Sequence, residues 1–360
     1  MQRERSSYQP TPISLERLAV STLVGWVVVS ALAGSARAVD GPNLVMDGDR
    51  MASTMKITTG IYHPPKPGPP LDATIPVSGS CVLDKTENCV GGAGIRKLLR
   101  FDVLVHNEGN EDLVIGDPAN LPNLFVYSPC HHHYHFKGAA LYELLDATAT
   151  KQVVKGRKQG FCIEDTLPDP NTHTPNKYLC NSQGIQVGWA DWYPSVLDCQ
   201  WIDITDIAPG DYTLHVFWNP QHLIPETTLD DNQAFAKVTI PADTSPAPVV
   251  DSIQVGQPRQ TIVANTHVTV SWHAEAPGGG VVTQEVWFSK DDGATWTELV
   301  GDVPGTESSY TWAIPRDAAT LAGRIRVVAR DSNAQAGRLV SDAFRVGLPK
   351  LSLPKVRERG

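Results

Sequence analysis

Apolar and polar residues alternate along several short stretches of the chain, and this period of two is typical of β-strands that bury one face. The alternation is clearest over four ranges: 212–218, 267–272, 282–287 and 324–328. An apolar run predicts one further strand over 98–106, whereas 139–145 is compatible with a short helix. Glycine (29 residues) and proline (28 residues) favour turns over long helices. The sequence therefore predicts a mainly β fold.

The first 38 residues have the organisation of a signal peptide. Three arginines precede an apolar run over 18–34, and Ala36-Arg37-Ala38 forms a small-x-small cleavage site. An uncleaved membrane anchor is the alternative, and Ser21, Thr22 and Ser30 within the run argue against it. We expect a secreted or periplasmic protein that has no membrane contact after cleavage.

A proline-rich segment over 241–248 has the composition of a short, stiff linker and divides the rest of the chain. We predict a larger β domain over 39–243, a small β-sandwich over 244–347 and a basic tail over 348–360. Residues 289–296 resemble a hairpin of fibronectin-type or immunoglobulin-like modules. This resemblance implies a fold rather than a chemistry, and such a module is expected to bind a protein or a surface polymer.

The net charge of the chain indicates which classes of binding partner it favours. A net charge of −9 argues against a protein that binds the phosphate backbone of nucleic acids. Residues 1–38 contain four Arg and two Glu, so the mature chain carries a net charge of −11. A field of this sign would steer cationic amines toward the protein.

Cysteine usage agrees with export. An even number of cysteines in an exported chain predicts disulfides, and the absence of a CxxC pair argues against a zinc ribbon. Counting alone allows fifteen pairings of six cysteines. The cysteines are Cys81, Cys89, Cys130, Cys162, Cys180 and Cys199.

Four histidines fall within the five residues His131-His132-His133-Tyr134-His135. On a strand, His131, His133 and His135 would share one face, although a bulge is needed for all three to reach one ion. Three neutral imidazoles without a carboxylate suit copper or zinc. The alternative is an exposed histidine-rich loop with adventitious metal affinity.

Four motifs in this order resemble the lysyl oxidase family over roughly residues 40–243. They are residues 128–146 around the histidines, 156–166, 198–212 and 218–226. The resemblance implies a lysyl-oxidase-type β-sandwich catalytic domain over 39–243 and copper on His131, His133 and His135. It also implies a lysine tyrosylquinone cofactor made from Lys158 and Tyr193. Taken alone, Lys158 could belong to a solvated basic turn and Tyr193 could be a core aromatic residue.

The implied activity is oxidative deamination of primary amines, either peptidyl lysine or small amines. Molecular oxygen is the acceptor, and the products are an aldehyde, hydrogen peroxide and ammonia. The catalytic base stays open, since Asp191 and Asp198 are near in sequence but each also suits a turn or cap. The family's disulfide pairing would be Cys81–Cys130, Cys89–Cys199 and Cys162–Cys180, with a local Cys81–Cys89 bridge as the alternative.

Three positions depart from the family pattern, and one of them is His132, where relatives often have Gln or Arg. Many animal members have a further histidine where this chain has Ser128. In some relatives an acidic segment holds calcium, which here would involve Asn43, Glu226, Asp231 and Asn232. Thr228 replaces the usual carboxylate there, and an Asx turn explains 230–232 as well.

Two other functions compete with the amine oxidase. One is an exported metal-binding protein with the same fold and no turnover, docked through the C-terminal module. The other is a zinc hydrolase with three histidine ligands, although the sequence contains no second catalytic constellation. A carbonyl stain of the copper-loaded protein distinguishes the amine oxidase from the metal-binding protein without turnover.

Overall fold

The computed structural model describes residues 40–64, 81–84, 87–157, 160–257 and 260–349. The predicted signal peptide, Lys158 and the tail from 350 onward lie outside the described residues. The described part is mainly β, which confirms the predicted fold class. In this part of the chain, no helix is long and apolar enough to cross a membrane.

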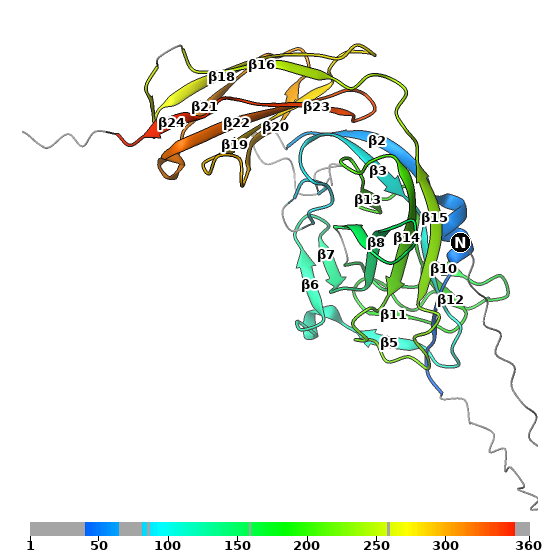
Figure 1. Ribbon diagram of the computed structural model, residues 1–360. Helices are drawn as coiled ribbons and strands as arrows, with labels where there is room; N and C mark the ends of the chain where they lie inside the picture. Colours follow the sequence, from blue (N-terminus) through cyan, green and yellow to red (C-terminus); the bar gives the residue numbers. More distant parts are fainter. Residues whose placement is uncertain (1–39, 65–80, 85–86, 158–159, 258–259, 350–360) are drawn as a thin grey trace, which may run out of the picture. The chain divides into compact units, whose positions relative to one another are not determined.

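The described strands up to Ile240 form small sheets (Figure 1), and their side chains build a large and a smaller hydrophobic cluster. The strand orders are β1-β4-β12-β10, β15-β14-β8-β9, β13-β3-β2, β11-β5 and β6-β7. The strands are β1 (Leu44–Met46), β2 (Lys56–Tyr62), β3 (Gly94–Arg100), β4 (Val103–Asn107), β5 (Leu113–Gly116), β6 (Phe125–Ser128), β7 (His133–Phe136), β8 (Ala140–Asp146), β9 (Gln152–Lys155), β10 (Leu167–Pro168), β11 (Gln183–Ile185), β12 (Trp189–Tyr193), β13 (Trp201–Asp203), β14 (Gly210–Trp218) and β15 (Gln233–Ile240). The helices are α1 (Gly48–Thr54) and the 3-10 turn η1 (Pro118–Asn120).

The strand β14 lies between β8 and β15, as the alternation over 212–218 predicts. The expectation of a short helix over 139–145 is wrong, because this segment forms β8. Leu144 pairs with Leu214, and the alternate residues Ala140, Tyr142 and Leu144 are buried. A stretch of seven mostly apolar residues is too short for its periodicity to separate a helix from a strand.

The predicted strand over 98–106 is divided into β3 and β4 at Phe101-Asp102. The buried carboxylate of Asp102 explains the break. It accepts hydrogen bonds from the backbone N–H of Ser195 (2.7 Å), from Trp192 Nε1 (2.9 Å) and from Arg50 Nε (3.1 Å). These partners come from distant parts of the chain, so the local pattern could not show the break.

The second domain is a β-sandwich with its own hydrophobic core. One sheet has the order β16-β18-β21, and the other has the order β17-β24-β22-β19-β20 with β23 paired to β22. The strands are β16 (Val249–Val255), β17 (Ile262–Val263), β18 (His267–Glu275), β19 (Thr283–Ser289), β20 (Thr297–Pro304), β21 (Ser309–Ala313), β22 (Thr320–Arg330), β23 (Ala336–Val340) and β24 (Phe344–Gly347), with the 3-10 turn η2 (Arg316–Ala318).

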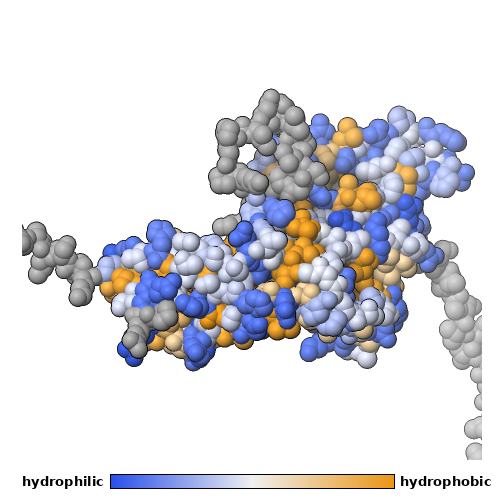
Figure 2. All heavy atoms as spheres, turned by 90° about the horizontal axis from the view of Figure 1, so that it is seen from above, coloured by the Kyte–Doolittle hydropathy of each residue, from blue (hydrophilic) through white to orange (hydrophobic). Residues whose placement is uncertain are grey.

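Local turn chemistry shapes this sandwich as the sequence predicts. Asp292 and Gly293 both adopt left-handed backbone conformations, with φ of 60° and 93°, in the turn after β19. The side chain of Asp291 accepts hydrogen bonds from the backbone and hydroxyl of Thr295, which closes the turn. On the face shown in Figure 2, apolar patches alternate with polar and charged residues.

Candidate active site

The histidine cluster is carried by the hairpin of β6 and β7. Ser128 pairs with His133 and Val126 pairs with His135. The predicted single strand through all three histidines is wrong, because β7 begins only at His133 and His131 lies in the preceding turn. His132 takes a left-handed conformation in that turn, with a φ of 58°. The turn supplies the bend that a straight strand lacks.

The three alternate histidines converge despite this irregularity. Their potential ligand nitrogens all lie within 4.8 Å of one another, and His133 Nε2 is 3.0 Å from His135 Nε2. His133 also lies near the sulfurs of Cys162 and Cys180, but these two are joined in a disulfide and offer no thiolate. His132 is exposed and lies outside the cluster. The donor set is therefore nitrogen-rich, which suits copper or zinc.

Three disulfides surround this region, and their pairing confirms the prediction made from the family resemblance. Cys81 pairs with Cys130, Cys89 with Cys199 and Cys162 with Cys180. The local Cys81–Cys89 alternative is wrong. The pairs are separated by 49, 110 and 18 residues, so each contributes about 3–5 kcal/mol in the chain-entropy account.

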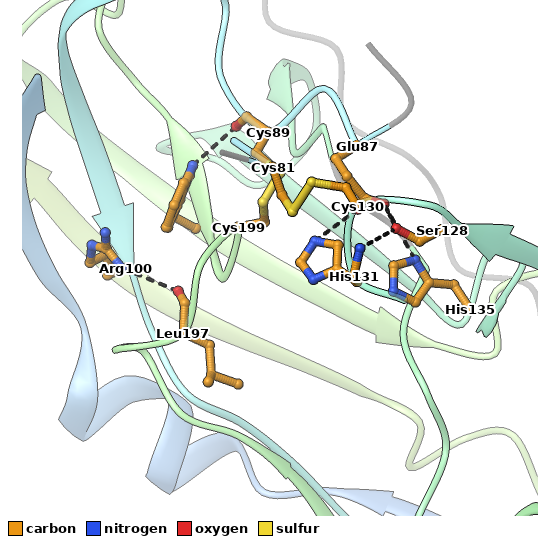
Figure 3. The surroundings of a disulfide bond; sticks show 11 residues. Cys81, Glu87, Cys89, Arg100, Ser128, Cys130, His131, His135, Leu197 and Cys199 are labelled. Carbon is orange, nitrogen blue, oxygen red and sulfur yellow. Dashed lines mark hydrogen bonds and ion pairs between the residues drawn. A yellow bond between two sulfur atoms is a disulfide. The ribbon is translucent and has the colours of Figure 1, made fainter. Parts of the chain in front are cut away.

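A buried carboxylate, Glu87, also faces the histidines and was missed by sequence reasoning. Its carboxylate oxygens lie 3.4 Å from His131 Nε2 and 3.8 Å from His135 Nδ1 (Figure 3). The Cys81–Cys130 disulfide brings the loop containing Glu87 to the hairpin. The signal that could have found Glu87 is therefore the disulfide pairing, because the Cys81–Cys130 bridge joins the segment before Glu87 to the residue next to His131.

Tyr193 ends the strand β12, and its hydroxyl donates a short hydrogen bond to the carbonyl oxygen of Cys162. Its ring packs on Phe161 with 4.6 Å between the ring centroids. The backbone N–H of Phe136, next to His135, donates to the carbonyl of Phe161 at 2.7 Å. The segment 160–162 therefore connects the histidine hairpin with Tyr193.

Gly160 permits this close packing. A Cβ atom at this position would lie only 3.2 Å from His135 Cβ and from the carbonyl oxygen of Phe136. Lys158 lies two residues earlier and falls outside the described residues, so its role stays a prediction.

The two proposed acids differ sharply in environment. Asp191 is fully buried on β12, two residues before Tyr193, and its carboxylate has no hydrogen-bond partner among the described residues. Burial, followed by the charge of Glu164, raises the pKa of Asp191 well above its ordinary value. Burial and the neighbouring Asp191 likewise raise the pKa of Tyr193. Asp198 is exposed.

A cavity of about 520 Å³ opens beside the histidines. Its walls combine aromatic and aliphatic surface with two carboxylates, and burial raises the pKa of one of these, Glu164. Glu164 interacts electrostatically with Asp191, so it links the cavity to the surroundings of Tyr193. The lining residues include Asp117, Tyr127, His132, His133, Tyr134, Glu164 and Leu179.

Residues 76–246 match the family model described as "Lysyl oxidase". This part of the chain belongs to the lysyl oxidase family. Over 156 residues it is 37% identical to protein-lysine 6-oxidase of Rattus norvegicus, covering 41% of this chain and 37% of that protein. The same enzyme of Sus scrofa gives 37% identity over 156 residues, covering 41% of this chain and 61% of the relative. The chain thus spans less than two thirds of either relative.

Solved structures add little to this assignment. Fibronectin(III)-like modules of Clostridium thermocellum CbhA cover 72% of this chain and 90% of their own, at 10% identity and a TM-score of 0.23. Similarity at this level carries no argument, so the sandwich is assigned from its own sheets.

The segments predicted to hold calcium also come together in the lysyl oxidase domain. Asn43 Nδ2 donates to Asp231 Oδ2 at 2.9 Å. Glu226 Oε1 accepts from Asn232 Nδ2 (2.8 Å) and from Asn219 Nδ2 (2.7 Å), a residue that the sequence did not single out. Asp231 Oδ1 and Asn232 Oδ1 are buried without a hydrogen-bond partner among the described residues.

The raised pKa of Asp191 predicts a specific dependence of stability on pH. A proton held more tightly in the folded than in the unfolded chain stabilises the fold at low pH, and this contribution is lost as pH rises through the folded pKa. Asp191→Asn removes the titration. We expect the unfolding free energy of the variant to rise relative to that of the native chain from about pH 4 upward. Urea unfolding of the copper-free protein at several pH values measures the difference.

Asp102→Asn is the matched control, because Asp102 is also buried but its pKa shifts the other way. Burial alone would raise the pKa of Asp102, but hydrogen bonds from Ser195, Trp192 and Arg50 lower it. The native chain should therefore gain stability relative to this variant as pH rises. A pH-independent difference for Asp191→Asn would contradict the assignment.

Proposed function

We propose that this protein is a copper-dependent, quinone-containing amine oxidase. It would deaminate primary amines, either peptidyl lysine or small amines, to aldehydes with molecular oxygen as acceptor. Hydrogen peroxide and ammonia would be the other products. The three disulfides are typical of proteins that fold in an oxidising compartment, which supports a secreted or periplasmic location.

The observation that carries this proposal is the connection between the histidine cluster and Tyr193. Three imidazoles lie within 4.8 Å of one another, and the segment 160–162 connects their hairpin to the tyrosine ring. A histidine cluster linked through one short segment to a partly buried tyrosine suits redox chemistry on the phenol. A metal-binding protein without turnover would need the histidine cluster but not the tyrosine connected to it.

The residues fit the implied groups in their chemistry. His131, His133 and His135 would hold copper, and Lys158 and Tyr193 would form the quinone. When formed, the quinone supplies a carbonyl group that accepts the substrate amine and passes its electrons to oxygen. The hydrogen bond from the Tyr193 hydroxyl to the Cys162 carbonyl and the packing on Phe161 hold the ring in one orientation.

Asp191 is the better placed of the two acids to exchange a proton near Tyr193. Asp191 is fully buried two residues before Tyr193, whereas Asp198 lies exposed on the surface. Glu164 at the cavity wall would pass protons between Asp191 and the substrate pocket. A general base should have a pKa near the working pH, and burial moves the pKa of Asp191 in that direction.

The cavity suits an amine on an alkyl stem. The rings of Tyr127 and Tyr134 and the side chain of Leu179 offer apolar walls, while Asp117 and Glu164 offer negative charge. An alkyl chain could lie along the apolar wall while the ammonium group approaches a carboxylate. The cavity is open, so both a peptide side chain and a small amine could enter.

Replacing single histidines tests the function. We expect His133→Ala to abolish both copper retention and amine-dependent peroxide release, because one of the converging ligands is lost. His132→Ala is the matched control for copper retention, because its ring lies outside the cluster. It is not a control for peroxide release, because His132 also lines the cavity. Copper content, peroxide release and phenylhydrazine staining are the measurements.

Each competing function predicts another pattern. A binding protein without turnover would retain copper but neither stain nor release peroxide in the native chain. A zinc hydrolase would be active with zinc in the absence of oxygen. Equal copper loss in the His132 and His133 variants would overturn the assigned ligand set.

We also propose that Asn43, Glu226, Asp231 and Asn232 hold a calcium ion. The two buried oxygens without partners, on Asp231 and Asn232, support this, since calcium prefers oxygen ligands. Calcium should raise the free energy of unfolding by about 2.7 kcal/mol at a concentration 100 times its dissociation constant, and the unfolding midpoint should rise with it. Thermal unfolding with and without a chelator measures it, and Glu226→Gln should remove the response. No shift in millimolar calcium would exclude the site.

A further inference from the structure

Glu87 is a nearly fully buried carboxylate in contact with two of the three clustered histidines. Its side chain is 4% exposed, and it lies 3.4 Å from His131 Nε2 and 3.8 Å from His135 Nδ1. In Figure 3 the Glu87 side chain extends toward both rings and toward Ser128. A buried carboxylate is costly unless it is hydrogen-bonded or paired with positive charge. The groups around Glu87 must therefore compensate for the burial of its carboxylate.

The loop that carries Glu87 is held from both sides. Cys81 bonds to Cys130, next to His131, and Cys89 bonds to Cys199. Within the loop, the backbone N–H of Asn88 donates to the carbonyl of Asp84 at 2.7 Å. The carboxylate thus comes from a fixed segment rather than from a loop that could turn away.

Ser128 connects the carboxylate with the hairpin. Its hydroxyl donates to Glu87 Oε1 at 2.5 Å and accepts from the backbone N–H of His131 at 3.1 Å. This is the position at which many animal relatives of the family have a histidine. In this chain the serine fixes both the carboxylate and the turn that carries the first ligand.

The contacts of His135 define which nitrogen faces which group. Its Nδ1 is directed at Glu87, while its Nε2 lies 3.0 Å from His133 Nε2. A carboxylate beside Nδ1 favours the proton on that nitrogen, which leaves the lone pair of Nε2 for a metal. His131 directs its Nε2 at the same carboxylate from 3.4 Å, so Glu87 faces both rings.

We propose that Glu87 is a positioning residue that fixes the orientation of His131 and His135, and the tautomer of His135, for metal binding. The carboxylate also adds a negative charge beside the imidazoles, which favours a divalent cation. This inference rests on the proposed copper site, but it concerns a residue outside the ligand set. It replaces the expectation of three histidines without a carboxylate.

Copper affinity tests the inference without use of catalytic turnover. Glu87→Gln keeps the size of the side chain and removes its charge. We expect Cu(II) affinity to fall by about 10- to 100-fold, as for other residues that orient metal-bound histidines. The measurement is competition with a chelator of known affinity on metal-free full-length protein, kept without oxygen. Ser128→Ala should also lower Cu(II) affinity, by a smaller factor. This variant provides the test if Glu87→Gln does not fold.

Asp102→Asn is the matched control, since it also removes a buried carboxylate but has no contact with the histidines. It should lower stability and leave copper affinity unchanged. Electron paramagnetic resonance of the copper-loaded Glu87→Gln protein should still show nitrogen coupling from histidines, with the coordination of the native chain.

Three outcomes are distinguishable. Unchanged affinity in both Glu87→Gln and Ser128→Ala overturns the positioning role. A changed set of directly bound atoms in the resonance spectrum would make Glu87 a ligand, which also overturns it. If the native chain itself binds no copper through nitrogen, the proposed function fails rather than this inference alone.

Discussion

The disulfide between Cys81 and Cys130 is the constraint on which the site depends. It joins two segments 49 residues apart and fixes the backbone immediately before His131. The turn after Cys130 contains a left-handed residue, His132, and His131 converges with His133 and His135 on β7. The same bridge brings the Glu87 loop against the rings (Figure 3). Without this cross-link, the geometry of the cluster would depend on a four-residue turn alone.

A second constraint is the burial of Asp191 beside Tyr193. The partly buried tyrosine ring packs on Phe161, and the carboxylate of Asp191 is fully buried. Burial of this kind lowers stability, since both groups would be better solvated in the unfolded chain. Proteins keep such uncompensated groups most often where a shifted pKa serves the chemistry. The cost at Asp191 is thus an argument for function.

Much of the fold was predictable because strands with one buried face carry a local pattern. The segments 212–218 and 267–272 form β14 and β18 as the alternation indicates. The pattern failed at 139–145, where seven residues fit either period, and at Asp102, whose partners lie 48 to 93 residues away. Family motifs, rather than spacing, supplied the disulfide pairing and Tyr193. Glu87 could not be found, because its place depends on a long-range bridge.

The most direct test of the account is peptide mapping by mass spectrometry after exposure of the protein to copper and oxygen. The account predicts that the peptides containing Lys158 and Tyr193 are recovered as one cross-linked species. The cross-link should be absent from protein kept free of copper and from the His133→Ala variant. Recovery of both residues separately and unmodified from fully active enzyme would contradict the account.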